Sequence, residues 1–299
     1  MSFLWLTTLS ALRILRRNPL RAGLTMLGII IGIGAVVAMV SLGQGATASV
    51  QAEIASLGTN VMIIVPGATT VGGVRGGLGS ISTLTVGDAE DIRTKVGSVS
   101  MVIYGSRSVL QVIHENKNWS TVVVGTTPEF PDIRNWPIAQ GNFITQSDMD
   151  SAAKVVVLGK TAAQNLFEPG EEMVGAEIRI KNTPLRVIGI LAPKGQSISG
   201  QDQDDMVVLP FSTAERKVLG TKFLGTVGII LVATQTRHEI PAAVADIKEL
   251  LRARHHLPAS EEDDFTIRTM EDIANTIAGT SRTMMLMLMG IASISLIVG

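Results

Sequence analysis

The residues closest to a catalytic motif are Gly159, Lys160 and Thr161, which follow the apolar run 155–158. A strand that ends in Gly-Lys-Thr and leads into a helix resembles the end of a phosphate-binding loop. That loop also needs a glycine at the first position of G-x-x-x-x-G-K, so that backbone N–H groups can surround the phosphates. This chain has Lys154 there, and the residues between are apolar. The sequence therefore predicts no nucleotide site here.

The sequence shows no residue spacing that is typical of a metal site. His255 and His256 are adjacent, so their side chains cannot share one face of a helix. The chain has no cysteine, which excludes thiolate metal sites, disulfides and a cysteine nucleophile. The acidic run 261–264 lacks the alternation and central glycine of a calcium loop, and we expect it to be a solvated turn. We therefore expect no metal site and no cofactor.

A polar segment before a predicted strand contains Gln203, Asp204 and Asp205. Two interpretations stay open for it, a contact with a partner or substrate and a plain polar surface loop. The glycine-rich run 71–80 reads as a flexible loop, because no helix follows it directly to present N–H groups to an anion. No nucleophile–base pair and no paired carboxylates in an apolar setting occur in the sequence. We expect a protein without catalytic residues, not an enzyme.

Composition excludes several classes of partner. The chain has 299 residues, 46% of them hydrophobic and 17% charged, against about 25% charged in soluble domains. The net charge is −1 and aromatic residues make up 4%. No basic field and little stacking surface are available for nucleic acid, so we expect no nucleic-acid partner.

Two uncharged stretches, 22–43 and 283–299, enclose a more polar middle. The first has about the 20 residues that a helix needs to cross a bilayer core, which makes membrane lipid a partner. A buried core helix is the alternative, but such helices rarely run so long without a charge. A cleaved signal peptide would have a shorter apolar region. The layout predicts a membrane protein with a large domain on one side.

The arginines before the first stretch predict the orientation of that domain. Arg13, Arg16, Arg17 and Arg21 precede the stretch, whereas the first charge after it is Glu53. By the positive-inside rule the N-terminus is cytoplasmic. The middle of the chain would then be periplasmic.

The membrane-associated segments have their own patterns. Residues 1–21 read as an amphipathic helix on the inner leaflet or, alternatively, as a plain cytoplasmic extension. Within the crossing helix, Gly28, Gly32 and Gly34 could let a second helix approach closely, although glycine is common in membrane helices. The helix is expected to continue past Gly43 as a stalk.

The middle, 44–282, mixes strands and helices. Thr85 with Asp88 reads as a capping box for a helix that ends near Lys95. A hairpin turn is expected at 182–183, and Pro241 begins a helix to about 255. A further short helix could be capped by Ser212 with Glu215, and helix is expected again from Glu271. Strands are predicted at 61–65, 99–104, 109–114, 119–124, 154–158, 177–180, 185–191, 206–209, 229–232 and 265–268. The fold class is α+β, a mixed α/β domain between two membrane helices.

A set of motifs in this order resembles the MacB-type (MacB/FtsX-like) ABC transporter permeases. The motifs span essentially the whole chain, and no single one is decisive. They are Arg17-Asn18-Pro19-Leu20-Arg21, LTMLGIIIGIGAVVAMVSLGQGA, SLGTNVMIIVPG, Val157-Leu158-Gly159, Val187-Ile188-Gly189, Gln203-Asp204-Asp205, Asp263-Asp264-Phe265-Thr266-Ile267 and the run from Gly290 to Gly299.

The resemblance implies an architecture and a set of partners. A porter-like part with an inserted β-rich subdomain at about 116–219 would form a periplasmic domain in a permease of the bacterial inner membrane. The permease would be a homodimer that works with a separate ABC ATPase subunit, and a periplasmic adaptor protein and outer-membrane exit duct are candidate partners. The stretch 283–299 would be the start of the second membrane helix, so this sequence would be part of a longer permease.

The resemblance also implies a function. Cytoplasmic ATP hydrolysis would drive a periplasmic conformational change that expels substrate, which is called mechanotransmission. A membrane receptor with a periplasmic sensor domain is an alternative of another class. A lipoprotein-releasing or cell-division relative of the same permeases is an alternative within the class.

Overall fold

The computed structural model of the chain describes residues 19–57, 60–67, 70–71, 74–75, 83–197, 200–220 and 224–298. They divide into two compact units, Met1–Gln51 with Ala274–Gly299, and Ala52–Ile273. The predicted segment 1–21 lies almost wholly outside the described residues, as does Gly58. Each unit is described separately below.

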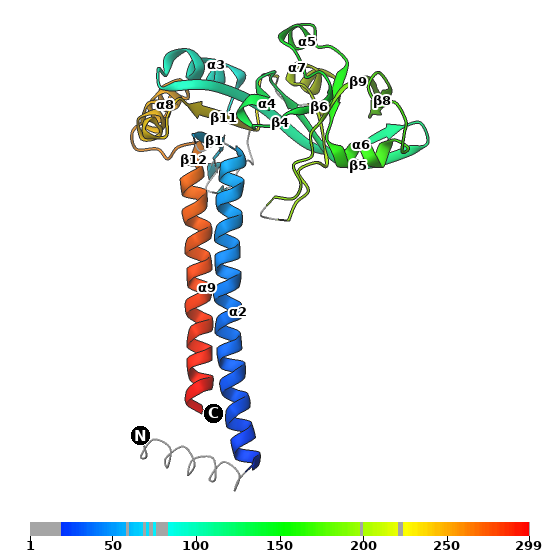
Figure 1. The fold of residues 1–299 in the computed structure, drawn as a ribbon. Coiled ribbons are helices and arrows are strands. Elements are labelled where there is room, and N and C mark those ends of the chain that lie inside the picture. Colours follow the sequence, from blue (N-terminus) through cyan, green and yellow to red (C-terminus); the bar gives the residue numbers. More distant parts are fainter. Residues whose placement is uncertain are drawn as a thin grey trace. The chain divides into compact units, whose positions relative to one another are not determined.

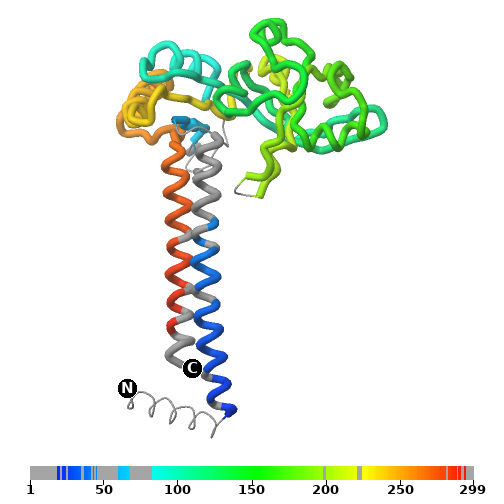
Figure 2. Tube along the Cα trace, in the orientation of Figure 1, coloured from blue at the N-terminus to red at the C-terminus, as the bar shows by residue number. Residues whose placement is uncertain are grey.

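Two long helices dominate the first unit, and they lie side by side (Figures 1 and 2). Helix α2 (Pro19–Leu57) has 39 residues and α9 (Met270–Val298) has 29. A Cβ placed on Gly43 of α2 would lie 3.1 Å from Met285 Cε of α9. Among the described residues, one helical segment, Ala22–Ser41, is long and apolar enough to cross a membrane. The continuous helix past Gly43 confirms the predicted extension of α2.

The second unit is built on a 10-stranded sheet with the order β12-β1-β11-β4-β5-β10-β7-β9-β6, with β8 pairing with β4 and β9. Most neighbouring strands are antiparallel, but β10 with β5 and β7 with β9 are parallel. The strands are β1 (Val61–Pro66), β4 (Val99–His114), β5 (Lys117–Thr126), β6 (Ile138–Gly141), β7 (Val155–Leu158), β8 (Glu177–Ile180), β9 (Thr183–Leu191), β10 (Met206–Pro210), β11 (Ile229–Thr234) and β12 (Phe265–Thr269). A separate short ladder joins β2 (Thr70–Val71) to β3 (Val74–Arg75).

Short helices connect and cover these strands (Figure 1). The longest is α8, which begins next to Pro241 as predicted and has 15 residues. The helical segments are α3 (Val86–Lys95), α4 (Phe130–Ile133), α5 (Gln146–Asp150), α6 (Lys160–Leu166), α7 (Phe211–Thr213), η1 (Ala214–Leu219), η2 (Arg237–Glu239) and α8 (Ile240–Arg254).

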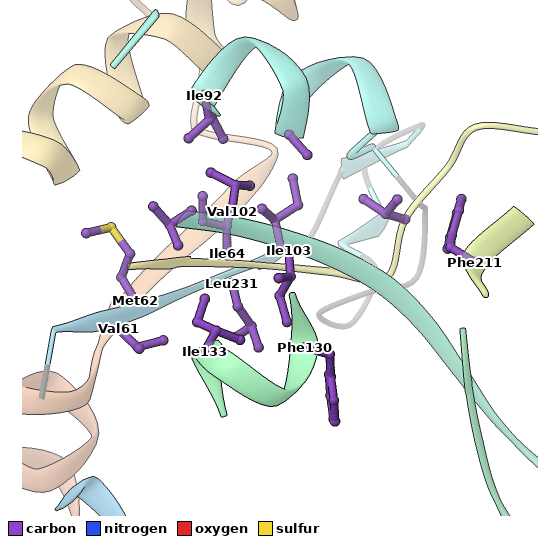
Figure 3. Close-up of a cluster of buried hydrophobic side chains, with 14 of the residues drawn as sticks. Val61, Met62, Ile64, Ile92, Val102, Ile103, Phe130, Ile133, Phe211 and Leu231 are labelled. Carbon is purple, nitrogen blue, oxygen red and sulfur yellow. The ribbon is translucent and has the colours of Figure 1, made fainter. Parts of the chain in front are cut away.

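Two clusters of buried side chains stabilise the second unit. The larger joins β1, β4 and β11 to α3, α4 and α8, and Figure 3 shows Met62, Ile64, Ile92 and Val102 meeting in it. The smaller, which includes Val112, Leu158 and Ile180, packs α6 against β5, β7, β8 and β9. Burial of apolar surface on this scale is the main stabilising contribution in such a domain.

The mixed arrangement confirms the predicted fold class. The capping box at Thr85 and Asp88 is present at α3, and the hairpin between β8 and β9 turns where it was expected. The predicted strands 61–65, 206–209, 229–232 and 265–268 match β1, β10, β11 and β12 to within two residues.

Three predictions about local structure were wrong. The strands expected at 99–104 and 109–114 are one strand, β4, because Gly105 and Ser106 pair in register with β11 and β5 and so continue the ladder. Ser212 and Glu215 do not cap a helix. The Ser212 hydroxyl donates to the Met149 carbonyl oxygen and the Glu215 carboxylate accepts from Gly225 N. The run 71–80 was expected to be only a loop, but part of it forms β2 and β3.

Candidate functional site

The two long helices are connected in sequence to two paired strands of the second unit, β1 and β12. The chain enters the sheet through β1 after α2, and it leaves through β12 into α9. The two strands pair antiparallel from Met62↔Thr269 to Pro66↔Phe265. Because the strands are antiparallel, both helix attachments lie at the same end of this strand pair. The chain connections to the two long helices are therefore made by the same pair of strands.

The joint between β12 and α9 contains no loop. The strand ends at Thr269 and the helix begins at Met270. Thr269 N and Oγ1 donate to Asp272 Oδ2 at 3.0 and 2.7 Å, and Asp272 N donates back to Thr269 Oγ1 at 3.0 Å. These bonds satisfy backbone donors that are unpaired at a helix start. The pKa of Asp272 is lowered, first by the backbone N–H of Thr269 and then by its hydroxyl.

The other end of the strand pair is fixed by Asp264, the residue before β12. Its backbone oxygen accepts from Gly67 N and from Thr83 Oγ1, both at 2.8 Å. Its carboxylate oxygen Oδ1 lies 2.7 Å from His255 Nδ1. A Cβ on Gly67 would lie 2.7 Å from the Asp264 carbonyl carbon, so the close approach requires glycine. Asp264 thus joins the end of β1, the segment before α3 and the end of α8.

A buried carboxylate, Asp88 in α3, continues this network. Its side chain is 2% exposed, and it accepts from Thr85 N, from Arg254 Nε at 2.5 Å and from His255 Nε2 at 3.2 Å. Arg254 also pairs with Asp91. We call Asp88, Arg254, His255 and Asp264 the Asp88 cluster. It connects α3, the end of α8 and the start of β12.

Protonation in the Asp88 cluster follows from its geometry. Both ring nitrogens of His255 face carboxylates, so the ring is held as an imidazolium. The hydrogen bond to Asp88 raises the pKa of His255 against the opposing effect of burial, and with Asp264 brings it to about 9. Burial alone would raise the pKa of Asp88, but hydrogen bonds from His255, Arg254 and Thr85 outweigh it and hold the pKa well below its usual range.

The acidic run 261–264 is not simply the solvated turn that the sequence predicts. Asp263 pairs with Lys248 at 2.8 Å and with Arg252, and Asp264 belongs to the Asp88 cluster. The correction has a physical cause, because folding brings the basic end of α8 back against the run. Sequence patterns identified the capping box of Asp88, but Arg254 lies 166 positions away from it. No local signal indicates that pairing.

The loop around Gln203, Asp204 and Asp205 is tied into the domain. Asp204 is 6% exposed, and its carboxylate accepts from Lys194 N at 2.7 Å and Gly195 N at 2.9 Å. Asp205 accepts from Trp119 Nε1 at 2.8 Å. These two carboxylates organise the loop, whereas Gln203 is half-buried at its surface. Contact of this loop with a partner or substrate stays a prediction.

The Gly159-Lys160-Thr161 segment lies directly against this loop. Thr161 Oγ1 donates to Asp202 Oδ2 at 2.7 Å, and Gly159 N donates to Met206 O at 2.9 Å. A Cβ on Gly159 would collide with the Asp204 backbone oxygen. The segment therefore packs a carboxylate and a backbone carbonyl where a phosphate-binding loop would hold an anion.

The described residues offer two other features to consider as sites, metal-ligand groups and a cavity. Among the described residues, no three His, Asp or Glu side chains form a group that could hold a metal ion. A cavity of about 120 Å³ lies beside α3, lined by Glu90, Arg93, Tyr104 and Glu129 among others. Ligand pockets usually begin at about 300 Å³. The cavity is therefore too small to be a candidate site for a drug-sized substrate.

The predicted helix-packing glycines differ in their surroundings. Gly32 of α2 is buried, Gly28 is half-buried and Gly34 is exposed with open space around it. Their role in packing stays a prediction. Of the arginines used for orientation, Arg13, Arg16 and Arg17 lie outside the described residues, as does the side chain of Arg21.

Fold and site together define a class, an α+β domain whose edge strand pair continues into long helices, one of them apolar enough to cross a membrane. The chain belongs to the MacB-like periplasmic core domain family, whose model matches residues 22–250. This confirms the predicted resemblance. The family is that of MacB-like ABC transporter permeases.

Relatives and solved structures agree with this assignment. The chain is 36% identical over 97% of its length to a macrolide export ATP-binding/permease protein MacB from Syntrophobacter fumaroxidans, and 37% identical over 100% to one from Azoarcus sp.. It covers 48% and 43% of these proteins, so it spans about half the length of the curated relatives it matches.

The solved periplasmic region of MacB from Actinobacillus actinomycetemcomitans matches 76% of the chain and 97% of that structure, with 25% identity and a TM-score of 0.62. The extracellular domain of the noncanonic ABC-type transporter YknZ from Gram-positive bacteria shares the fold, with 15% identity, a TM-score of 0.57, and 70% and 100% coverage.

Proposed function

We propose that this chain is the permease part of an ABC-type exporter and that it transmits ATP-driven motion to a periplasmic domain, which then expels substrate. The strand pair is the observation that carries the proposal, because both long helices join the domain through β1 and β12 at the same end. A domain connected in this way responds to helix movement as a lever. No catalytic step by its own residues is needed.

We also propose which proteins this chain works with. ATP hydrolysis is assigned to a separate ABC subunit, and a second permease copy, a periplasmic adaptor and an outer-membrane exit duct complete the exporter. The relatives are named macrolide export proteins, which makes export the preferred role over lipoprotein release. Co-purification of the permease with a separately expressed ATPase tests the first assignment. Recovery of the permease alone would contradict it.

The proposed orientation has a cytoplasmic N-terminus and a periplasmic domain in the inner membrane. The four arginines before residue 22 support it, since no charge follows until Glu53. Protease added outside spheroplasts should cleave between residues 60 and 273. Protection of this region, with cleavage only after lysis, would contradict the orientation.

A more flexible connection between β12 and α9 tests whether motion of the helix is transmitted to the sheet. Two glycines inserted between Thr269 and Met270 should make the connection flexible and interrupt the capping bonds of Asp272. In the complete transporter, we expect ATP hydrolysis to continue while substrate export is lost. The control is the same insertion after Gly97, an exposed turn residue between α3 and β4 with open space around it.

The outcomes of this test are distinct. Export that persists with the loosened joint would show that motion does not pass through β12. Loss of both activities, with a lower melting temperature, would indicate a folding defect. The single variant Asp272→Asn, which keeps the chain length, then decides, because it weakens the joint without an insertion.

A further inference from the structure

The cavity beside α3 is lined by side chains from α3, β4, the turn after β5 and α5. Its volume is about 120 Å³, and Glu90, Tyr104, Thr127, Glu129 and Met149 are among the residues around it. A water molecule takes up about 30 Å³ in the liquid, so the cavity has room for about four waters or for one small molecule. The polar groups of the lining therefore decide which molecule fits.

The most buried polar side chain of the lining is that of Thr127. Thr127 is 5% exposed, and its Oγ1 atom is buried without a hydrogen-bond partner among the described residues. Buried hydroxyl groups in native structures nearly always make a hydrogen bond, to the protein, to water or to a ligand. The Thr127 hydroxyl is therefore available to a molecule in the cavity.

Thr127 and Glu129 are held on one short turn that leads into α4. Phe130 N donates to Thr127 O at 3.2 Å, and Ile133 N donates to Glu129 O at 3.1 Å. Glu129 is half-buried, and its carboxylate makes no capping bond to α4. In the part of the chain that the structure describes, it has no ion-pair partner either. A hydroxyl and a carboxylate are thus fixed close together in sequence at the cavity.

Tyr104, the single tyrosine of the chain, adds a third oxygen. Its ring packs edge-on against Phe211, with centroids 5.2 Å apart and an interplanar angle of 83°. Burial raises the pKa of Tyr104, and the carboxylates of Glu90 and Glu129 raise it further. The hydroxyl is therefore neutral, and its oxygen can accept a hydrogen bond.

The charges around the cavity favour a cation over an anion. Among the described lining residues the basic side chain is Arg93, which is 50% exposed and already paired with Glu90. The carboxylate of Glu129 has no such partner, so the lining has an excess of negative charge. A bound cation would balance this carboxylate, whereas a bound anion would be repelled by it.

We propose that the cavity binds a short-chain primary ammonium ion, whose N–H groups donate to the oxygens of Thr127, Glu129 and Tyr104. A primary ammonium group has three donors, which matches these three oxygen-bearing side chains. Met149, which is 9% exposed, and Pro128 give the alkyl chain an apolar wall. The site is separate from the strand pair and is independent of the proposed transport function.

Tyr104 gives the test a site-specific signal, because the chain has one tyrosine. The full chain in an uncharged detergent is labelled with carbon-13 tyrosine, and the ring resonance is followed by NMR. Ethylammonium chloride replaces sodium chloride at constant ionic strength. We expect the resonance to shift and to saturate with a Kd of about 1–10 mM, an affinity open to a ligand of about three heavy atoms. Ethanol, which has a similar size and no charge, should bind at least about tenfold more weakly.

Two substitutions test the proposed acceptors. Glu129→Gln keeps the shape of the side chain and removes its charge, so the Kd should rise about tenfold. Thr127→Val replaces the hydroxyl by a methyl group and should raise the Kd about threefold to tenfold. Glu115→Gln is the matched control, because it makes the same charge change in an exposed residue of the turn at the far end of β4. This control should leave the Kd unchanged.

Three results would overturn the proposal. One is a Tyr104 resonance that does not respond to ethylammonium, since solvent alone would then occupy the cavity. The second is an equal response to ethylammonium and to ethanol. The third is a Kd in Glu129→Gln that equals the Kd of the original chain. If Thr127→Val lowers the melting temperature, its weaker binding reflects a folding defect, and Glu129→Gln then decides.

Discussion

His255 Nδ1 lies 2.7 Å from Asp264 Oδ1, and this contact joins the end of α8 to the residue before β12. The same ring reaches Asp88 in α3 through Nε2 at 3.2 Å. One imidazolium thus connects the helices that cover the sheet with the strand that continues into α9. The Asp88 cluster fixes one end of the strand pair, and the Thr269–Asp272 capping bonds fix the other.

Removing charge from the Asp88 cluster should destabilise the second unit. Asp88→Asn removes the buried negative charge that Arg254 and His255 share, and we expect a loss of about 3–5 kcal/mol. Asp264→Asn weakens one charged hydrogen bond and should cost about 1–3 kcal/mol. Both losses of unfolding free energy can be measured by thermal or urea unfolding, followed by a spectroscopic signal from the second unit.

Asp91→Asn is the control for these variants, because Asp91 also pairs with Arg254 but is more exposed than Asp88. It should change stability much less than Asp88→Asn. Equal effects of the two substitutions would show that burial of Asp88 does not set the strength of the cluster.

Stability should depend on pH through His255. The pKa of this ring is raised from 6.5 to about 9 in the folded chain. Its contribution is therefore fully present below about pH 6.5 and is lost as the pH rises through about 9. The lowered pKa of Asp88 acts at the other extreme, where stability falls as the carboxylate is protonated in acid.

Melting temperatures between about pH 6.5 and pH 9.5 measure the alkaline effect. His255→Gln should remove most of the decline over this range and should be less stable near neutral pH. A variant that declines as steeply as the original chain would show that another group titrates.

A covalent clamp distinguishes two ways in which the strand pair could move. Val65 and Thr266 are directly opposite each other in β1 and β12, and the chain has no cysteine of its own. The double variant Val65→Cys and Thr266→Cys should form one disulfide. We expect export to survive oxidation, because the paired strands move as one body. Export that stops on oxidation and returns with reductant would show that the strands must separate.

The helix pair should be sensitive to size at Gly32 and insensitive at Gly34. Gly32 is buried and Gly34 faces open space on α2. Gly32→Leu should lower helix–helix stability by about 1–3 kcal/mol through overpacking. Unfolding in detergent, read by a fluorescent pair on α2 and α9, compares the two leucine variants. Equal losses would show that the burial of Gly32 does not set the packing of α2 against α9.

Substitutions in the 203–205 loop separate its structural from its recognition role. Asp204→Ala removes the carboxylate that accepts from Lys194 N and Gly195 N and should cost about 1 kcal/mol for each bond lost. Gln203→Ala removes one hydrogen bond, from Arg134 Nη2 to Gln203 Oε1 at 3.3 Å, and should cost no more than about 1 kcal/mol. If export falls in Gln203→Ala while the melting temperature holds, the loop contacts a partner or substrate.

Local patterns predicted much of the fold. The capping box at Thr85, the turn before Thr183 and the proline at the start of α8 depend on neighbours in sequence, and the structure has them where they were expected. The prediction failed where the outcome depends on distant partners. At Gly105 and Ser106 the sequence indicates a break, but pairing with β11 and β5 keeps the strand intact.

The candidate site also combines features that depend on sequence neighbours with features that depend on distant partners. The sequence alone determined the apolar stretch 22–43, the capping residues and the family resemblance, because length, hydropathy and short-range hydrogen bonding are local properties. Only the tertiary structure decided that Asp88, Arg254, His255 and Asp264 meet, and that β1 pairs with β12. The contacts of Asp88 with Arg254 and His255, and the pairing of β1 with β12, join residues more than a hundred positions apart. Side-chain chemistry permits many such pairings, and the packing of the whole sheet selects among them.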